Sequence, residues 1–188
     1  MNPNDYQSYA EIARDVREVL LTPEQIAQRI SELGRQISMD YADKDLLIVG
    51  VLKGVLMFMA DLLRQITIPV AVDFIAVSSY STEARDKGYV RLVKDLEIPI
   101  TGRNVLFIED VIDTGLTLNY LLRNLRARSP ASLEVCVMFD KPVRRLVEIP
   151  LRYRGFDIPD QFVVGYGLDY REKYRNLPFV GLLKAEAL

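Results

Sequence analysis

The sequence predicts an α/β fold in which a mostly parallel sheet is flanked by helices. Several runs are almost entirely apolar, helical stretches of crossover length lie between them, and 49% of the 188 residues are hydrophobic. Parallel strands buried on both faces have such runs, and each needs a long crossover before the next strand. A chain of this length buries one sizeable core, so we expect a single domain over residues 1–188.

The first element with a clear signature is a helix in the stretch LTPEQIAQRISELGRQI. Thr22 is expected as the N-cap, Pro23 suits the first helical position, and Gln25 completes a capping box. The apolar positions that follow share one face at helical spacing: Ile26, Ile30, Leu33 and Ile37. The pattern indicates an amphipathic helix.

Five apolar runs are expected to be strands buried on both faces. They are LLIVGV, centred on 47–51, VAVDFIAV (70–77), VLFI (105–108), LEVCVMF (133–139) and FVVGY (162–166). The stretches VLMFMADLLRQI and LTLNYLLRNLRAR between them favour crossover helices. In such sheets ligands bind outside the carboxyl ends of the strands.

Residues 78–104 interrupt this alternation of strands and helices. They begin with small polar residues, carry mixed charge and contain the alternating piece YVRLV. This pattern indicates a mobile loop that runs into a β-arm. A solvent-exposed excursion and a lid over a site are both compatible with it.

The composition excludes several kinds of chemistry. The chain has no histidine, which removes histidine triads, histidine bases and histidine metal ligands together. Its single cysteine, Cys136, lies in an apolar run and is expected to be an inert core residue. A metal, if one is used, should be a hard cation with oxygen ligands, such as Mg²⁺.

Charge and hydropathy also restrict partners and location. The net charge of −2 argues against an extended nucleic-acid interface. No apolar run reaches membrane-spanning length, and the N-terminus is polar and acidic where a signal peptide would be basic and then apolar. We therefore expect a cytoplasmic protein without nucleic-acid or membrane partners.

The stretch VLFIEDVIDTGLTL contains the strongest functional signal. Glu109 and Asp110 follow an apolar strand, and the turn 113–117, DTGLT, leads into a helix. Backbone N–H groups of such a turn, the positive end of the helix and threonine hydroxyls can hold a phosphate. The turn has no lysine and no GxxxxGK[ST] pattern, so it is not a nucleoside-triphosphate P-loop. The carboxylates beside it suit a ribose and a Mg²⁺ ion.

This stretch resembles the signature of the type I phosphoribosyltransferases, which bind phosphoribosyl diphosphate. Further motifs, VGVLKGVLMFMADL, SSY, DKP and PDQFVVGYGLDYREKYRNLPFVG, are similar to those of the hypoxanthine-guanine phosphoribosyltransferases, from about residue 12 onward. The resemblance implies the type I phosphoribosyltransferase fold, with a twisted sheet, a small hood and a flexible β-arm lid over about 78–104. It also implies transfer of the 5-phosphoribosyl group to N9 of hypoxanthine or guanine in purine salvage, and commonly a homodimer or homotetramer.

The resemblance also assigns roles to residues. It implies that Asp113 is the general base or acid at purine N7, and that Glu109 and Asp110 serve the ribose and a Mg²⁺ ion. Asp169 would bind a second Mg²⁺. The donor site would comprise Leu52, Lys53, Gly54, Ser79, Tyr80, Glu109, Asp110, Asp113, Thr114, Gly115, Leu116, Thr117 and Arg175. The purine site would comprise Lys141, Phe162, Val163, Leu168 and Asp169.

Within these sets, the turn 113–117 would hold the 5-phosphate, and Lys53 and Arg175 the diphosphate. Lys141 would donate a hydrogen bond to O6 of the base. This would favour 6-oxopurines over adenine, since the 6-amino group of adenine is itself a donor. The Leu52–Lys53 peptide is often cis in this family.

Two alternatives stay open. The same fold serves nucleotide-sensing regulators of transcription and RNA-binding attenuators, although Lys53, Asp113 and Lys141 favour an enzyme. An enzyme of this fold could also use xanthine or a pyrimidine. Taken singly, the residues have plain explanations: Lys141 as a surface lysine, Phe162 as core, and Asp169 and Arg175 as a surface ion pair.

Overall fold

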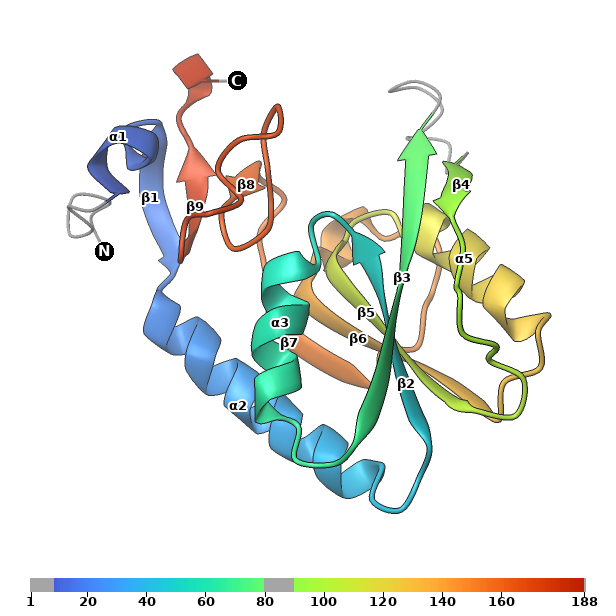
Figure 1. The fold of residues 1–188 in the computed structure, drawn as a ribbon. Helices are drawn as coiled ribbons and strands as arrows, with labels where there is room; N and C mark the ends of the chain where they lie inside the picture. Colours follow the sequence, from blue (N-terminus) through green and yellow to red (C-terminus); the bar gives the residue numbers. More distant parts are fainter. Residues whose placement is uncertain (1–8, 80–89, 188) are drawn as a thin grey trace.

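The structure of the protein, a computed structural model, describes residues 9–79 and 90–187 (Figure 1). A six-stranded sheet has the order β4-β3-β2-β5-β6-β7. Its strands are β2 (Leu46–Leu52), β3 (Val70–Ser79), β4 (Val90–Lys94), β5 (Asn104–Ile112), β6 (Ser132–Asp140) and β7 (Tyr153–Asp157). All neighbouring strands are parallel except β4, which runs antiparallel to β3. The predicted mostly parallel α/β sheet is therefore confirmed.

Helices cover both faces of this sheet. Helices α2 (Pro23–Asp40) and α3 (Leu56–Gln65) lie on one face, and α5 (Leu116–Arg126) lies on the other (Figure 1). Along β2, Leu46 and Ile48 belong to the core under α2 and α3, whereas Leu47 and Val49 belong to the core under α5. Because both faces are buried, each strand needs apolar residues at successive positions.

The predicted start of α2 is confirmed in detail. The Thr22 hydroxyl accepts a hydrogen bond from the Gln25 N–H at 3.3 Å, and the Gln25 side chain accepts from the Thr22 N–H at 2.9 Å. Pro23 occupies the first turn, where its missing N–H has no consequence. All four residues of the predicted apolar face are buried. The helix ends at Asp40, three residues beyond Ile37.

A second, three-stranded antiparallel sheet forms a small hood. Its strands have the order β1-β9-β8 and are β1 (Val16–Leu21), β8 (Val163–Val164) and β9 (Val180–Leu183). The hood has its own apolar cluster, in which Val16, Val164 and Phe179 take part. The remaining short elements are α1 (Ala10–Ala13) and the 3₁₀ turns η3 (Pro142–Arg144) and η4 (Ala185–Ala187).

The prediction that FVVGY is a buried strand of the main sheet is wrong. Only Val163 and Val164 are extended, and they pair with β9 in the hood. Gly165, Tyr166 and Gly167 all have positive φ, at 97°, 49° and 96°, which turns the chain out of the strand. Val164 packs in the apolar cluster of the hood, and Val163 and Tyr166 join the core under α2 and α3, so the run looks like a core strand in sequence.

The predicted β-arm is confirmed in the part of it that the structure describes. Strand β4 contains the VRLV of the YVRLV piece and pairs antiparallel with the end of β3, with Ser79 opposite Val90. Tyr80 lies outside the described residues. Movement of this arm as a lid stays a prediction.

None of the helices in the described part of the chain is long and apolar enough to cross a membrane.

One buried carboxylate, on Asp73 of β3, fixes the segment that follows the β-arm. Its Oδ2 accepts the backbone N–H groups of Glu97 at 2.7 Å and Ile98 at 2.9 Å, and Lys94 Nζ lies 3.3 Å from Oδ1. Burial alone would raise the pKa of Asp73, but the backbone hydrogen bonds outweigh it and hold that pKa below its usual range. Asp73 therefore works as an ionised acceptor.

Replacing Asp73 by Asn is expected to lower the free energy of unfolding by about 2 to 4 kcal/mol, because an amide cannot accept all of these donors. Urea unfolding at pH 7 measures the change. Asp43→Asn, in an exposed turn, is the matched control. An Asp73→Asn protein as stable as this control would contradict the assignment.

Candidate active site

The acidic turn lies where β5 passes into α5. Strand β5 runs to Ile112, four residues beyond the predicted VLFI, so Glu109 and Asp110 belong to its carboxyl end. Gly115 then has φ 81° and caps α5. A Cβ at Gly115 would meet Arg145 Cδ and a neighbouring backbone oxygen at 3.1 Å, so only glycine combines this φ with this packing.

The turn offers backbone donors. Within the described part of the chain, the N–H groups of Thr114 and Gly115 have no hydrogen-bond partner, whereas the Thr114 carbonyl accepts from Leu146 at 3.0 Å. The Thr114 carbonyl is therefore fixed by a hydrogen bond, and the N–H groups of Thr114 and Gly115 are free to bind a ligand. This is the arrangement expected of an anion-binding turn at a helix N-terminus.

The carboxyl end of β5 is in contact with two other segments. A Cβ on Gly54 would overlap the Asp110 carboxylate, and a Cβ on Gly167 would overlap the Gly54 carbonyl. The Leu52–Lys53 peptide that precedes Gly54 is cis. The Gly54 backbone therefore touches the Asp110 side chain on one side and the Gly167 backbone on the other, which brings predicted donor residues of loop 52–54 and β5 together.

The two carboxylates of this strand end lie in a poorly solvated place. Burial raises the pKa of Glu109 well above its usual range, and the neighbouring Asp110 raises it further. Burial also raises the pKa of Asp110 to about 6, against the lowering effect of backbone N–H groups and Arg175. Oε2 of Glu109 is buried without a hydrogen-bond partner. A cation or hydroxyl group bound here would supply what both side chains lack.

These residues fit a magnesium ion that a substrate helps to bind. Among the described residues, no three acidic or cysteine side chains are grouped closely enough to hold a metal alone. Mg²⁺ commonly binds through one or two carboxylates and completes its shell with water and phosphate oxygens. The unpartnered oxygen of Glu109 and the raised pKa of Asp110 suit that kind of site.

Two cationic side chains come from the neighbouring segments. Arg175 Nη1 donates to the Gly167 carbonyl at 2.8 Å, and Nη2 lies 2.9 Å from Asp169 Oδ1. Lys53 Nζ lies 3.0 Å from Glu172 Oε2. Asp169 and Arg175 therefore do form an ion pair, as their plain explanation from the sequence proposed. The pair nevertheless lies beside the predicted site.

The predicted purine residues come from β6 and the hood. Lys141 follows β6, is only 9% exposed, and donates through Nζ to the Gln161 carbonyl at 2.8 Å. Phe162 is 45% exposed and meets the Tyr170 ring edge to face, with 5.3 Å between ring centroids. These exposures exclude the interpretation of Lys141 as a surface lysine and that of Phe162 as a core residue. Val163 and Leu168 are buried behind them.

Asp113 is held by an arginine that sequence reasoning missed. Arg144 Nη1 lies 2.9 Å from Asp113 Oδ2, and Arg144 Nε lies 3.5 Å from Asp160 Oδ1. The other carboxylate oxygen, Asp113 Oδ1, is buried without a partner. One oxygen is thus fixed and the other is available to a ligand. The two arginines that follow shortly after DKP, in DKPVRR, were the available signal. Arg145 also donates to the Asp113 carbonyl at 3.2 Å.

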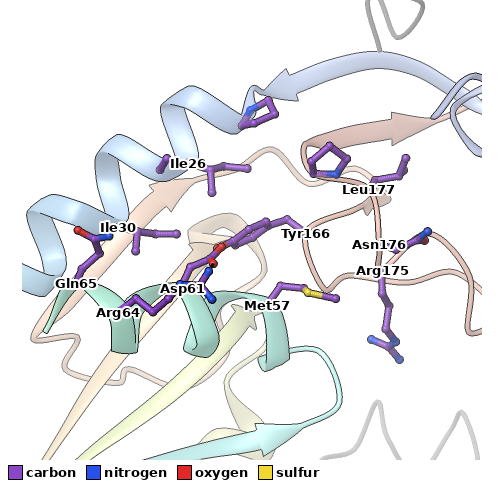
Figure 2. Close-up of a pocket in the computed structure, with 13 residues that line it drawn as sticks. Ile26, Ile30, Met57, Asp61, Arg64, Gln65, Tyr166, Arg175, Asn176 and Leu177 are labelled. Atoms are coloured by element: carbon purple, nitrogen blue, oxygen red, sulfur yellow. Dashed lines mark hydrogen bonds and ion pairs between the residues drawn. The ribbon is translucent and has the colours of Figure 1, made fainter. Parts of the chain in front are cut away.

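A cavity of about 420 Å³ lies behind this site, between α2, α3 and the segment 175–178. Ile26 and Ile30 line one side of it, and Tyr166 donates to Asp61 at 2.6 Å across it. Arg175 stands at its edge with its guanidinium pointing away from the two isoleucines (Figure 2). The cavity is thus a neighbour of the carboxylate and cation groups, and Arg175 is the predicted site residue in its lining.

The raised pKa of Asp110 predicts a pH effect on stability. The folded state binds this proton more tightly than the unfolded chain does, so stability falls as pH rises from about 4 to about 6. Asp110→Asn removes this loss and keeps an acceptor for the Val111 N–H. Without Mg²⁺, it should raise the free energy of unfolding by about 1 to 3 kcal/mol at pH 8 and much less at pH 4.

Urea unfolding of both proteins in EDTA at the two pH values measures this difference, with Asp43→Asn again as the control. An effect of Asp110→Asn that is equal at pH 4 and pH 8 would show that the carboxyl does not titrate between them.

Comparison with known proteins agrees with this geometry. The model of the "Phosphoribosyl transferase domain" family matches residues 17–171. Similar curated proteins include the hypoxanthine-guanine phosphoribosyltransferase of Mycobacterium avium, 51% identical over 90% of this chain and 86% of that protein. The enzyme of the same name from Bacillus subtilis is 46% identical over 90% and 94%.

Solved structures show the same likeness. The crystal structure of a hypoxanthine phosphoribosyltransferase from Staphylococcus aureus has a TM-score of 0.90 and 48% identity, over 94% of this chain and 96% of that one. The family match covers the acidic turn, the cis peptide and the predicted purine residues of β6 and of 162–169 together. The chain belongs to the phosphoribosyltransferase family and has its type I fold.

Proposed function

We propose that the protein transfers the 5-phosphoribosyl group from phosphoribosyl diphosphate to N9 of hypoxanthine or guanine, giving IMP or GMP and diphosphate. One observation carries the proposal furthest. Among the described residues, the buried side-chain polar atoms without a hydrogen-bond partner are Glu109 Oε2, Asp113 Oδ1 and Arg175 Nε. All three belong to residues expected to bind the donor. Orphaned buried atoms are rare in folded proteins, and a bound ligand explains them.

In this proposal the donor lies along the carboxyl end of β5. The turn 113–117 binds the 5-phosphate through its free N–H groups, and Leu116 and Thr117 begin the helix behind it. Glu109 and Asp110 face the ribose hydroxyls. Lys53 and Arg175 face the diphosphate, beside the Leu52 and Gly54 backbone. Ser79, at the end of β3, and Tyr80 belong to the arm expected to close over the donor.

Charge develops in this reaction in two places. Breaking the bond from C1 to the diphosphate leaves positive charge on the ribose and negative charge on the leaving group. The carboxylates at 109 and 110 stabilise the first, and the cations at 53 and 175 stabilise the second. Mg²⁺, when bound by Glu109, Asp110 or Asp169 and by the diphosphate, would neutralise leaving-group oxygens.

The purine is proposed to lie over Phe162, with Lys141 at its 6-oxo group. Burial lowers the pKa of Lys141, and Asp113 and Asp160 offset part of that effect. Its Nζ has further donors beyond the one that binds the Gln161 carbonyl. Asp113 Oδ1 is available to exchange a proton with N7. The backbone at Val163 and Leu168 is placed at the base edge.

We further propose that the enzyme works in the cytoplasm as a homodimer or homotetramer and has neither nucleic-acid nor membrane partners. The net charge of −2 supports the absence of a nucleic-acid interface. The partners of the site are then small molecules: the ribosyl donor, a 6-oxopurine and Mg²⁺.

A spectrophotometric assay tests the function. Purified protein with Mg²⁺ and phosphoribosyl diphosphate should convert hypoxanthine and guanine to nucleotides, and adenine at least about a hundredfold more slowly, because Lys141 would face a second donor. Xanthine and pyrimidines complete the panel. No nucleotide from any base would overturn the proposal, while product from xanthine or a pyrimidine alone would correct only the acceptor.

Asp113→Asn tests the proton transfer. It should lower kcat about 10²- to 10⁴-fold, since a positioned base has that effect, while the Kd of the donor changes less than about threefold. Asp157→Asn, on the exposed end of β7, is a control for the loss of one negative charge. If Asp113→Asn keeps the parent's kcat, Asp113 has no part in proton transfer.

A further inference from the structure

The two cations assigned to the diphosphate already share an anion within the protein. Oε2 of Glu172 lies 3.0 Å from Lys53 Nζ and 3.5 Å from Arg175 Nη2. Lys53 belongs to the loop after β2, whereas Glu172 and Arg175 belong to the segment between β8 and β9. A single carboxylate oxygen therefore joins two segments that are far apart in the sequence, at the place where a diphosphate oxygen is expected.

The local backbone holds Glu172 in this position. Arg171 and Glu172 both have left-handed φ values, 51° and 63°, and Tyr170 pairs with Lys173 across the turn they form. The Glu172 N–H donates to Asp169 Oδ2 at 2.9 Å. Non-glycine residues seldom adopt this conformation, so the turn directs the Glu172 side chain specifically.

Glu172 is charged under ordinary conditions. A glutamate side chain is ordinarily ionised at neutral pH, and the Glu172 carboxylate lies within ion-pair distance of both Lys53 and Arg175. The carboxylate is therefore an anion at neutral pH, as the diphosphate is, and the two compete for the same donors.

The Lys53–Glu172 ion pair can be replaced easily by a pair between Lys53 and another anion. Its side chains are 69% and 65% exposed, and an ion pair in that much water contributes little to stability. The second carboxylate that pairs with Arg175, that of Asp169, is less exposed to water. The Arg175–Asp169 pair is only 24% and 30% exposed, and Asp169 also closes the turn through the Glu172 N–H. Asp169 is thus a fixed partner of Arg175, and Glu172 is a replaceable one.

We propose that Glu172 is an internal substitute for the diphosphate: its carboxylate occupies the place between Lys53 and Arg175, and the diphosphate displaces it. This inference rests on the proposed function, because it takes the diphosphate to bind at these cations. Glu172 then keeps the two cations in position while the site is empty. It lowers diphosphate affinity through competition and repulsion, which speeds release of the leaving group as a product.

Calorimetric titration of the whole protein with inorganic diphosphate and excess Mg²⁺ tests the proposal without any turnover. Glu172→Gln should bind diphosphate about three- to tenfold more tightly than the parent, because the competing charge and its repulsion are both removed. The gain should decrease at high salt, since these groups are exposed and screened. Unchanged or weaker binding by Glu172→Gln would overturn the inference.

Two further variants separate this effect from general charge. Glu186→Gln removes one exposed negative charge in η4, away from Lys53, and should bind diphosphate as the parent does. An equal gain there would also overturn the inference. In a Lys53→Met background, the gain from Glu172→Gln should become smaller, because one of the shared cations is gone; a gain of full size would overturn it.

The proposed function fails in a different way. A parent protein that binds no diphosphate at all would overturn that function and this inference together. A parent that binds diphosphate and turns over purines, but whose affinity does not respond to Glu172→Gln, overturns the inference alone.

Discussion

The site depends on a close contact between three segments, which leaves no room for a side chain at either of two glycines. Gly54 lies against the Asp110 carboxylate, and Gly167 lies against the Gly54 carbonyl. Each glycine comes from a different part of the chain: the loop after β2, and the turn that follows β8. Because interiors are closely packed, this contact fixes the distances between the carboxylates of β5 and the cations on either side of them. A larger residue at Gly167 would displace the Gly54 backbone, and one at Gly54 would displace the Asp110 carboxylate.

The carboxyl end of β5 also has an unusual electrostatic character. Burial raises the pKa values of both Glu109 and Asp110. The protein thus keeps a pair of acids in a place where their charge is poorly solvated, with Arg175 close enough to lower the pKa of Asp110. Such a place is unfavourable for the empty protein and favourable for a cation, or for a substrate carbon that becomes positive. The poorly solvated carboxyls lower the stability of the protein at this site, and the packing of the two large cores on either side of the sheet offsets that cost.

The sequence predicted the elements whose signals are local. The capping box of α2 needs only Thr22 and Gln25, and strands β2, β5 and β6 contain continuous apolar runs because both of their faces are covered. The hood could not be predicted from pattern. Its strand β8 has two residues, and its other two strands, β1 and β9, come from opposite ends of the sequence. The error at FVVGY has this cause, because a run that is apolar does not indicate which sheet it joins.

The site shows the same division between local and distant information. The acidic turn could be recognised because its residues are contiguous, and the family resemblance supplied Lys53, Lys141 and Arg175. The partners of these residues could not be recognised. Arg144 reaches Asp113 across 31 positions, and Glu172 reaches Lys53 across 119. Charged side chains with long flexible stems have no periodicity that would indicate their partners, so only the folded chain identifies them.

The order of the hood strands has a consequence for how the protein is made. Strand β9 lies between β1 and β8, although it is the last of the three to be synthesised. On a ribosome, the large sheet has all six of its strands before residue 180 emerges, but β1 and β8 then still lack their common neighbour. The surface that includes Phe162 can therefore be completed only after translation of Val180–Leu183, so a nascent chain acquires its scaffold first and its ligand-facing hood last.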